Sequence, residues 1–191
     1  RLNLPEGMSL EQSYDTSVFI EKSLEEVART LLIAIILVIA VIYLFLGSLR
    51  ATIVPAVTVP VSLISSMIFL NAFDFSINLL TLLAFVLAIG LVVDDAIVVL
   101  ENVYRRIEAG ESPLVAAFRG SRQVGFAVIA TTLVLVAVFV PIAFLEGDLG
   151  KLFKEFAITL AVAVCFSSIV ALSLSPMLAS KVLRPATKTR G

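Results

Sequence analysis

The stretch LLTLLAFVLAIGLVVDDAIVVL, residues 79–100, decides the fold of this chain. Its only charged side chains are those of Asp94 and Asp95, and its apolar residues do not alternate with polar ones. Roughly 20 apolar residues are enough for a helix to cross a bilayer. Because lipid offers the backbone no hydrogen bonds, a run of this length without alternation favours a helix over a strand. The stretch therefore predicts a membrane-spanning helix with two carboxyl groups inside it.

The composition gives the rest of the chain the same character. Of the 191 residues, 60% are hydrophobic and 15% are charged, whereas a soluble domain has about 25% charged residues. The chain has no His, no Trp, one Cys and a net charge of −1. These counts exclude a Ser-His-Asp site, a Cys/His zinc site and a disulfide-stapled domain, and they argue against nucleic-acid binding through a basic surface. No Gly-rich phosphate loop with a following Lys is present, so ATP hydrolysis within this chain is not expected. Taken together, the composition predicts a membrane protein, and we expect neither enzymatic activity nor a metal or cofactor.

We predict an all-α membrane protein in which five helices form a bundle. The longest apolar run, residues 51–100, is about twice the length of one span. It must fold back where Asn71, Asp74, Ser76 and Asn78 cluster. The expected helices cover residues 28–48, 51–72, 76–103, 123–145 and 154–179 of a membrane part 27–180.

The distribution of Lys and Arg predicts the orientation of the bundle. One side would receive nine basic residues, and the other would receive five together with most of the carboxylates. The nine are Arg50, Arg105, Arg106, Arg119, Arg122, Lys181, Arg184, Lys188 and Arg190, and the five are Arg1, Lys22, Arg29, Lys151 and Lys154. Because basic loops stay in the cytoplasm, we expect the N-terminus outside and a cytoplasmic tail over residues 181–191.

The segment before the first span, residues 1–26, is polar and acidic and lacks the features of a signal peptide. Residues 17–20 could end a strand. Ser23 and Glu26 have the spacing of a capping box, in which the Ser oxygen accepts a free backbone N–H and the Glu reaches back. We therefore expect the first helix to begin at this box, outside the bilayer, and a folded domain to precede Arg1.

The loop 104–122 is expected to carry a short helix on the cytoplasmic surface. Ser112 and Pro113 have the order of an N-cap followed by proline at the first helical position. The spacing of one helix face is shared by Leu114, Ala117, Phe118 and Ser121. An irregular basic loop that obeys the positive-inside rule is an equally good interpretation of this segment.

Asp94 and Asp95 form the candidate site. They fall near the expected bilayer midplane, where one Asp costs about 2.5–3.5 kcal/mol. Consecutive helical positions are about 100° apart, so the two side chains cannot share one narrow seam. Two carboxyl groups this close in a low dielectric are not both ionised at neutral pH, and such a coupled pair is suited to taking a proton from one side and releasing it to the other. Gly90, one turn earlier, would let another helix approach this face closely.

A purely structural pair, bonded to a buried cation, is the alternative. Away from their ends the predicted spans contain no Lys or Arg, so such a cation would come from outside this chain. Ionisable residues inside a membrane are functional by default, which favours proton coupling. Among the weaker candidates, Glu101 and Asn102 are interpreted as anchors in the headgroup region. Thr131 and Thr132 are expected to bond to their own helix in preference to a neighbour.

Four stretches of the chain resemble one family. FSINLLTLLAFVLAIGLVVDDAIVVLENV, residues 75–103, closely resembles the fourth transmembrane helix of resistance-nodulation-division (RND) multidrug efflux pumps. Three flanking strings resemble, in register, the end of the periplasmic porter domain and two helix-to-helix turns of that family. They are YDTSVFIEKSLEEV (14–27), LFLGSLRATIVPAVTVPVSLI (44–64) and FVPIAFLEGDLGKLFKEFAITLAVAV (139–164). The resemblance covers essentially the whole chain.

This resemblance implies helices two to six of a proton/drug antiporter in the bacterial inner membrane. The family's proton-relay aspartates fall on Asp94 and Asp95, and the adjacent pair favours the branch that exports hydrophobic or amphiphilic compounds. Family members are homotrimers that work with a periplasmic adaptor protein and an outer-membrane channel. The relay's Lys, Arg and Thr partners and the drug-binding pockets belong to parts of the family that this chain lacks, so the chain alone is not expected to transport.

Two other interpretations remain open. A five-helix sterol- or lipid-sensing module resembles the same five helices, although the unbroken match to efflux strings argues against it. The other interpretation is a truncated gene product that has only a structural role. The surrounding reading frame separates them, because a second set of six helices with a midplane Lys and two large periplasmic insertions would support the transporter.

Overall fold

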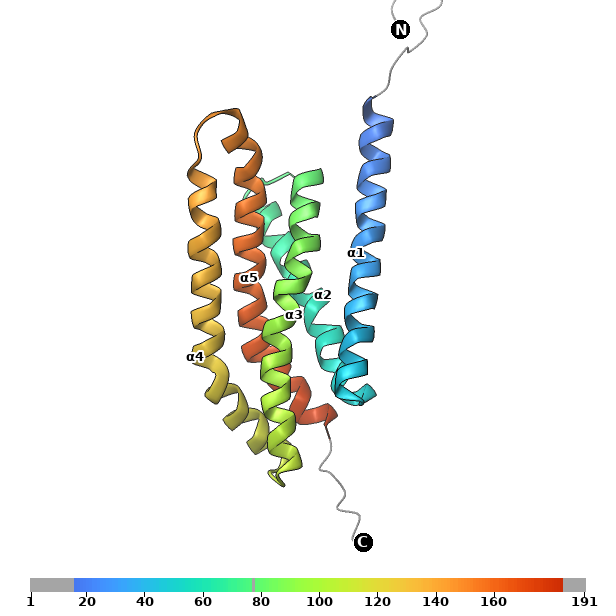
Figure 1. Ribbon diagram of the computed structural model, residues 1–191, viewed down its shortest axis with the longest axis vertical. Coiled ribbons are helices and arrows are strands. Elements are labelled where there is room, and N and C mark those ends of the chain that lie inside the picture. The colour runs from blue at the N-terminus through green and yellow to red at the C-terminus, as the bar shows by residue number, and fades with distance from the viewer. Residues whose placement is uncertain (1–15, 77, 184–191) are drawn as a thin grey trace, which may run out of the picture.

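The described part of the chain forms five long α-helices and one short 3-10 helix (Figure 1). The computed structural model describes residues 16–76 and 78–183. The α-helices are α1 (Thr16–Leu46), α2 (Leu49–Ala72), α3 (Leu79–Glu108), α4 (Pro113–Phe139) and α5 (Gly147–Val182), and the 3-10 helix η1 is Val140–Phe144. All five α-helices contain a segment long and apolar enough to cross a membrane, and the described residues contain no strand. The predicted all-α membrane bundle is confirmed.

Helices that follow one another along the chain run antiparallel, so α1, α3 and α5 share one direction, and the beginning of α1 and the end of α5 lie at opposite ends of the bundle (Figure 1). α3 packs against each of the other four α-helices, and α5 packs against α2, α3 and α4. α1 and α4 contact fewer neighbours and lie at the periphery (Figure 1). The helix that carries the two aspartates is therefore the central one of the described bundle.

α1 begins far earlier than predicted. Thr16–Leu46 is one helix, so residues 17–20 do not end a strand and Ser23 lies inside the helix instead of capping it. The expected capping box is wrong because the charged residues before the apolar run mark where the helix enters the apolar layer. They do not mark where the helix begins. Between Thr16 and the apolar part the chain has neither Pro nor Gly, and Glu, Lys and Leu all favour helix. The rest of the segment that we expected to end a preceding domain, residues 1–15, lies outside the described residues.

A two-residue turn joins α1 to α2. Gly47 has a φ of 60°, a left-handed conformation that glycine adopts without steric cost. Its N–H donates to the Tyr43 carbonyl oxygen at 2.9 Å and so closes α1. Ser48 then caps α2, because its side chain accepts a hydrogen bond from the Ala51 N–H at 3.4 Å. The turn places Arg50 in the first turn of α2.

The polar turn predicted between the second and third spans is present. Asp74 has a φ of 57° in this turn. Asn78 and Thr81 form a capping box: the Thr81 N–H donates to Asn78 Oδ1 at 2.9 Å, and the Asn78 N–H donates to Thr81 Oγ1 at 2.8 Å. The side-chain amide of Asn78 also donates to Glu155 on α5. This cap explains why α3 begins at Leu79, slightly later than predicted.

The interpretation of residues 104–122 as a loop with its own surface helix is wrong. α3 continues to Glu108 and α4 begins at Pro113, so the connecting segment is short. Ser112 and Pro113 do occupy the expected N-cap and first helical positions. The helix then continues without a break into the predicted fourth span, because no Pro interrupts it before Pro141. In Figure 1 the beginning of α4 slants toward the end of α3.

Close packing holds the beginning of α4 on α3. A Cβ atom added to Gly120 would lie 3.2 Å from the backbone N and Cα of Val103, closer than real Cβ contacts usually come. The Gly120 carbonyl oxygen accepts a hydrogen bond from the buried side-chain amide of Asn102 at 2.8 Å. These contacts favour one continuous helix over a separate segment on the membrane surface.

The fourth and fifth spans also differ from the predicted bounds near their junction. α4 passes into η1, which has a proline at its beginning, and a proline cannot donate the backbone bond that would continue an α-helix. α5 begins at Gly147, earlier than the predicted residue 154, and ends at Val182. The predicted bounds followed charge, which locates the apolar layer and not the full helix.

Two apolar clusters fill the interior, one after the other along the bundle. The first includes Ile89 and Val92 of α3 with Leu160 of α5. The second includes Val99 of α3 and Ala171 of α5. The boundary between them falls at mid-helix on both α3 and α5, where both helices carry polar side chains.

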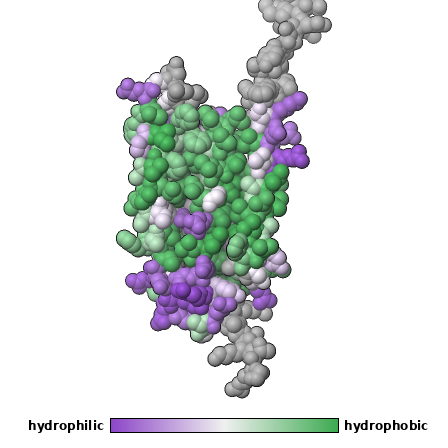
Figure 2. Space-filling model, in the orientation of Figure 1, coloured by the Kyte–Doolittle hydropathy of each residue, from purple (hydrophilic) through white to green (hydrophobic). Residues whose placement is uncertain are grey.

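Apolar side chains cover most of the middle of the molecule, apart from a small polar patch, and polar side chains gather at its two ends (Figure 2). The turns from α1 to α2 and from α3 to α4 and the end of α5 lie at one end (Figure 1). The described basic residues at this end are Arg50, Arg105, Arg106, Arg119, Arg122 and Lys181. We refer to it as the basic end of the bundle.

Candidate functional site

Asp94 and Asp95 lie at the middle of α3. Because consecutive helical residues point about 100° apart, the two side chains meet different surroundings. Asp95 is buried, with 8% of its surface exposed, whereas Asp94 is exposed. One carboxyl group therefore faces into the described bundle, and the other faces a side of α3 that no described helix covers.

Hydroxyl groups of α5 hold the buried carboxylate. Asp95 Oδ2 accepts hydrogen bonds from Ser167 Oγ at 3.0 Å and, more weakly, from Ser168 Oγ at 3.5 Å. Ser167 Oγ also lies 3.1 Å from the carbonyl oxygen of Val92. Ser168 Oγ contacts Thr132 Oγ1 of α4. A chain of hydroxyl groups thus runs from the aspartate on α3 through α5 to α4, between the two apolar clusters.

This hydroxyl chain accommodates Asp95 in either protonation state. Each hydroxyl has one proton to donate and two lone pairs that accept. When Asp95 is ionised, Ser167 and Ser168 donate to the carboxylate. When Asp95 is protonated, it donates to a serine, and the serine protons turn to the α3 carbonyl beside Ser167 and to Thr132. Thr132 in turn donates to the Val128 carbonyl oxygen at 2.8 Å, so each hydroxyl in the chain keeps a partner.

Asp94 shares its uncovered side of α3 with Gly90, one turn earlier. A Cβ atom added to Gly90 would meet no atom within 4 Å. Leu87 and Val98, which flank the two residues along the helix, are exposed as well. We refer to this side, which contains Leu87, Gly90, Asp94 and Val98, as the open face of α3. None of the five described helices makes the close approach expected at Gly90, and that approach remains a prediction.

A groove borders the open face between α1 and α3. Its volume is about 520 Å³, and it is lined by Val41, Ile42, Phe45, Ile97, Glu101 and Tyr104. Glu101 is exposed and lies two helical turns from Asp94 on the same side of α3. Two carboxylate side chains thus face the uncovered side of the described bundle.

No cation within the described residues neutralises either aspartate. The ion pairs of the described chain join Arg106 and Arg119 to Glu111, at the basic end. Asp94 and Asp95 take part in none of them. A cationic partner for this pair would have to come from outside the described residues, in agreement with the absence of Lys and Arg from the middle of the predicted spans.

The hydroxyl partners of Asp95 were not predicted from the sequence. Ser167 and Ser168 stand side by side in an otherwise apolar stretch of α5, and this pair was the signal that could have indicated them. Thr132 bonds to its own helix, as expected, but it also contacts Ser168. Thr131 likewise bonds to the Val128 carbonyl of its own helix at 2.9 Å, so the expected intrahelical bond is confirmed for both threonines, and Thr132 makes its interhelical contact in addition.

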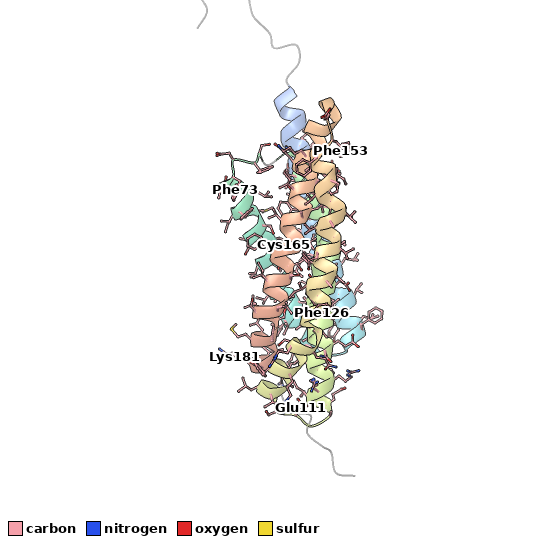
Figure 3. All side chains as sticks on the ribbon, turned by 90° about the vertical axis from the view of Figure 1, so that its left-hand side faces the viewer. Phe73, Glu111, Phe126, Phe153, Cys165 and Lys181 are labelled. Atoms are coloured by element: carbon pink, nitrogen blue, oxygen red, sulfur yellow. The ribbon has the colours of Figure 1, made fainter. Side chains whose placement is uncertain are left out.

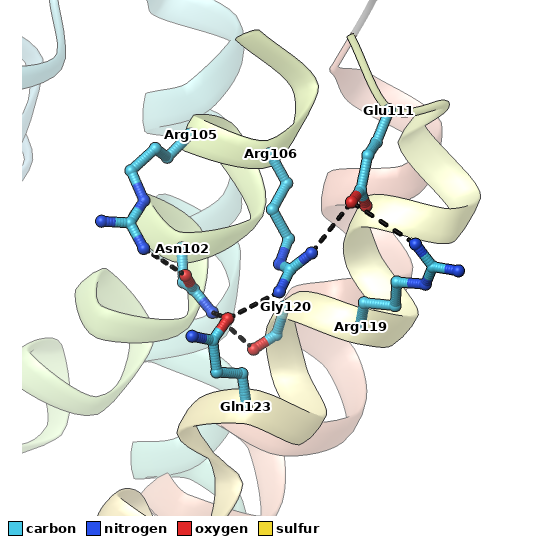
Figure 4. Close-up of polar contacts among 7 residues, drawn as sticks. All are labelled: Asn102, Arg105, Arg106, Glu111, Arg119, Gly120 and Gln123. Atoms are coloured by element: carbon cyan, nitrogen blue, oxygen red, sulfur yellow. Dashed lines mark hydrogen bonds and ion pairs between the residues drawn. The ribbon is translucent and has the colours of Figure 1, made fainter. Parts of the chain in front are cut away.

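The sequence suggested that Asn102 anchors α3 in the headgroup region, but the structure places this side chain in the interior. Its side chain is buried, and Nδ2 donates to the Gly120 carbonyl oxygen at 2.8 Å and to Gln123 Oε1 at 3.3 Å (Figure 4). The residue therefore ties α3 to α4. Glu101, its neighbour, is exposed.

Arg106 and Glu111 strengthen the same junction (Figure 4). Arg106 Nη1 lies 2.9 Å from Glu111 Oε1, and Arg106 Nη2 donates to Gln123 Oε1 at 2.7 Å. Arg119 reaches the same Glu111 oxygen at 3.6 Å. These contacts fix the short connection between α3 and α4 at the basic end.

Comparison with known proteins supplies the family. The chain matches the AcrB/AcrD/AcrF family over residues 1–191. It is 50% identical over 188 residues to an uncharacterized transporter of Haemophilus influenzae, which covers 98% of this chain and 18% of that protein. It is also 50% identical to the multidrug resistance proteins MdtC of Yersinia enterocolitica and Pectobacterium carotovorum, over 96% and 98% of this chain and 18% of each relative. A match of this extent and identity shows that the chain belongs to the AcrB/AcrD/AcrF family of resistance-nodulation-division transporters.

Proposed function

We propose that this chain is the proton-coupling part of the membrane domain of a longer proton/drug antiporter. It spans 18% of the length of the relatives that it matches, and in this proposal it supplies helices two to six and does not transport alone. The exported compounds are hydrophobic or amphiphilic. The name multidrug resistance protein, which the MdtC relatives carry, and the adjacent Asp94 and Asp95 support this substrate class.

One observation carries the proposal: a buried carboxyl group at mid-helix is held by hydroxyl groups and by no described cation. A Lys or Arg bonded to Asp95 within this bundle would favour the ionised form of the carboxyl group at every stage. Hydroxyl groups can both donate and accept, so Ser167 and Ser168 serve Asp95 with and without its proton. A group of this kind is suited to repeated proton uptake and release.

Asp94 connects this chemistry to the rest of the transporter. It lies on the open face beside Gly90, where a further helix can come close to the backbone of α3. A cation on that helix attracts the aspartate pair when it is ionised and loses the attraction when the pair is protonated. Proton uptake then changes how tightly the two halves of the membrane domain hold together, and this change is the coupling step that we propose.

The same proposal includes the expected assembly and location. The chain lies in the bacterial inner membrane with its N-terminus in the periplasm and the basic end of the bundle in the cytoplasm, following the distribution of Lys and Arg. The longer protein is a homotrimer that works with a periplasmic adaptor and an outer-membrane channel. The Lys, Arg and Thr residues of the relay come from the second half of its membrane domain.

Substitution in the full-length transporter tests the proposal. Asp94→Asn and Asp95→Asn each remove the ability to release a proton while nearly preserving side-chain volume. We expect proton-driven efflux of a fluorescent amphiphile to be lost in both variants, although the protein is inserted in the membrane at the normal level. Asp74→Asn is the matched control, because Asp74 has a φ of 57°, a conformation that Asn also adopts readily.

Retained proton-driven efflux in both variants would overturn the proposal. Loss of efflux in Asp74→Asn to the same degree would show that the assay responds to any lost carboxylate and would also count against it. The sterol- or lipid-sensing alternative predicts that none of the three variants changes efflux, because such a module does not transport.

A further inference from the structure

We propose that the beginning of α4 binds an anionic phospholipid of the leaflet at the basic end of the bundle, with Arg119 and Arg122 holding its phosphate. This inference is independent of proton coupling, because it concerns the outer side of α4 and none of the residues around Asp94 and Asp95. It rests on the side chains that α4 leaves uncovered and on their charges.

The outer side of α4 has the composition of a surface that faces lipid. Phe126 is 84% exposed and lies on the helix that Figure 3 shows from outside. Ile129 and Leu133 follow it at helical spacing and are also exposed. α4 lies at the periphery of the described bundle (Figure 1), so these side chains extend toward the acyl chains of a surrounding bilayer.

The same side of α4 continues to the basic end with a different composition. Arg122 lies one turn before Phe126, directly before the charge-free run, and Arg119 precedes it by three residues. Toward the beginning of α4, before the two arginines, this side is apolar again: Phe118 is 63% exposed and Leu114 is 72% exposed. A basic pair directly before the lipid-facing apolar segment of a span is the pattern of a helix that leaves the acyl region at this point, where its basic side chains meet the headgroups.

The charge of Arg122 is free for a ligand. Its guanidinium carbon lies over the Phe118 ring, 5.6 Å from the centre of the ring, and this cation–π contact holds the group without neutralising its charge. No described carboxylate is within ion-pair distance of Arg122. Arg119 shares Glu111 with Arg106, which lies closer to that carboxylate, at 2.9 Å against 3.6 Å.

These features select the chemistry of the lipid. Two guanidinium groups on one side of a helix bind the oxygens of a phosphodiester. They attract an anionic headgroup such as phosphatidylglycerol more than a zwitterionic one, because the ammonium of a choline headgroup is repelled by the same arginines. Phe126 and Ile129 then offer an apolar path for the acyl chain, and Phe118 and Leu114 bring the helix start into the interface.

Lipid titration of the purified full-length transporter tests this proposal. We would add phosphatidylglycerol or phosphatidylcholine to the protein in detergent and count bound lipids by native mass spectrometry. We expect preferential binding of phosphatidylglycerol, weakened about fivefold in Arg122→Gln and about thirtyfold in the double variant Arg119→Gln/Arg122→Gln. Phe118→Leu keeps an apolar side chain but removes the ring under Arg122, and should weaken binding by about two- to fivefold.

Lys181→Gln is the matched control, because Lys181 is an exposed basic residue in the last turn of α5 at the same end of the bundle. It should leave the affinity for phosphatidylglycerol within about twofold of the wild type. An equal loss in Lys181→Gln would overturn the proposal in favour of unspecific attraction to a basic surface. Wild-type affinity in the double variant would overturn it as well and would mean that another part of the longer protein covers this side of α4. Full competition by inorganic phosphate at the lipid concentration would also overturn it, because the site would then recognise free phosphate and not the lipid.

Discussion

Ser167 donates a 3.0 Å hydrogen bond to the carboxylate of Asp95, and this contact joins α5 to α3 where the two apolar clusters of the bundle meet. Both side chains are buried. The same serine hydroxyl lies within reach of the Val92 carbonyl, so it has a second acceptor when the carboxyl group carries a proton. The relationship makes Ser167 a positioning residue for the buried aspartate.

The first prediction concerns this serine. Ser167→Ala removes the nearer donor to Asp95, and a hydrogen bond to a charged group contributes about 1.5–3 kcal/mol. The balance between the ionised and protonated forms of Asp95 should therefore change by roughly tenfold or more. We expect the pH dependence of transport by the full-length protein to change, which a purely structural role would not cause. Ser168→Ala should have a smaller effect, because its bond to Asp95 is longer, at 3.5 Å.

Ser175 provides the control for that experiment and a prediction of its own. It lies on the same helix and is fully buried, but its hydroxyl has no hydrogen-bond partner among the described residues. Because an unpaired buried hydroxyl costs free energy, Ser175→Ala should leave the pH profile in place and raise the free energy of unfolding by about 1 kcal/mol. Thermal unfolding of the purified protein measures this, and a loss of stability would show that the hydroxyl has a partner in the longer protein.

The contrast between Asp95 and Asp94 shows how far the sequence predicts the site. The two residues, their depth and the inability of both to face one seam all follow from charge-free runs and helical geometry. The sequence does not predict which of the two aspartates is buried, because that depends on which side of α3 packs against the part of α5 that carries Ser167 and Ser168. The adjacent serines mark a polar position in α5, but only the packing of α3 on α5 shows that they meet Asp95 and not Asp94.

The predicted helix bounds differ from the observed ones because hydropathy reports the apolar layer and not the full length of a helix. Hydropathy locates the apolar layer well, as α2 shows, but helices continue past it where the polar sequence still favours helix. α1 begins at Thr16 and α4 at Pro113 for this reason. The packing of Gly120 against Val103, which holds the beginning of α4, has no counterpart in the periodicity of the sequence.

Asn102 carries the next prediction, on the junction of α3 and α4. Its buried amide donates to the Gly120 carbonyl at 2.8 Å and to Gln123 Oε1 at 3.3 Å, and truncation to alanine removes both hydrogen bonds. Asn102→Ala should lower the free energy of unfolding by about 1–3 kcal/mol. Glu111→Gln, at the partly exposed ion pair with Arg106, should cost at most about 1 kcal/mol. Thermal unfolding of both variants compares them, and a larger effect of Glu111→Gln would contradict the assignment of Asn102 as the main tie.

Gly120 and Gly125 lie five residues apart in α4 and should respond to alanine in opposite directions. At Gly120 the new Cβ would lie 3.0 Å from Val103 Cγ2 and 3.2 Å from the Val103 backbone, which cannot move without shifting α3. At Gly125 the nearest atom is Leu172 Cδ2, at an ordinary 3.8 Å. Gly120→Ala should therefore destabilise the protein by about 1–3 kcal/mol, whereas Gly125→Ala should be neutral or stabilise it by up to about 1 kcal/mol, since alanine favours helix over glycine. The same thermal-unfolding measurement serves both variants. Equal behaviour of the two would mean that α4 does not rest on α3 at Gly120, and the continuous helix from Pro113 would then lose its explanation.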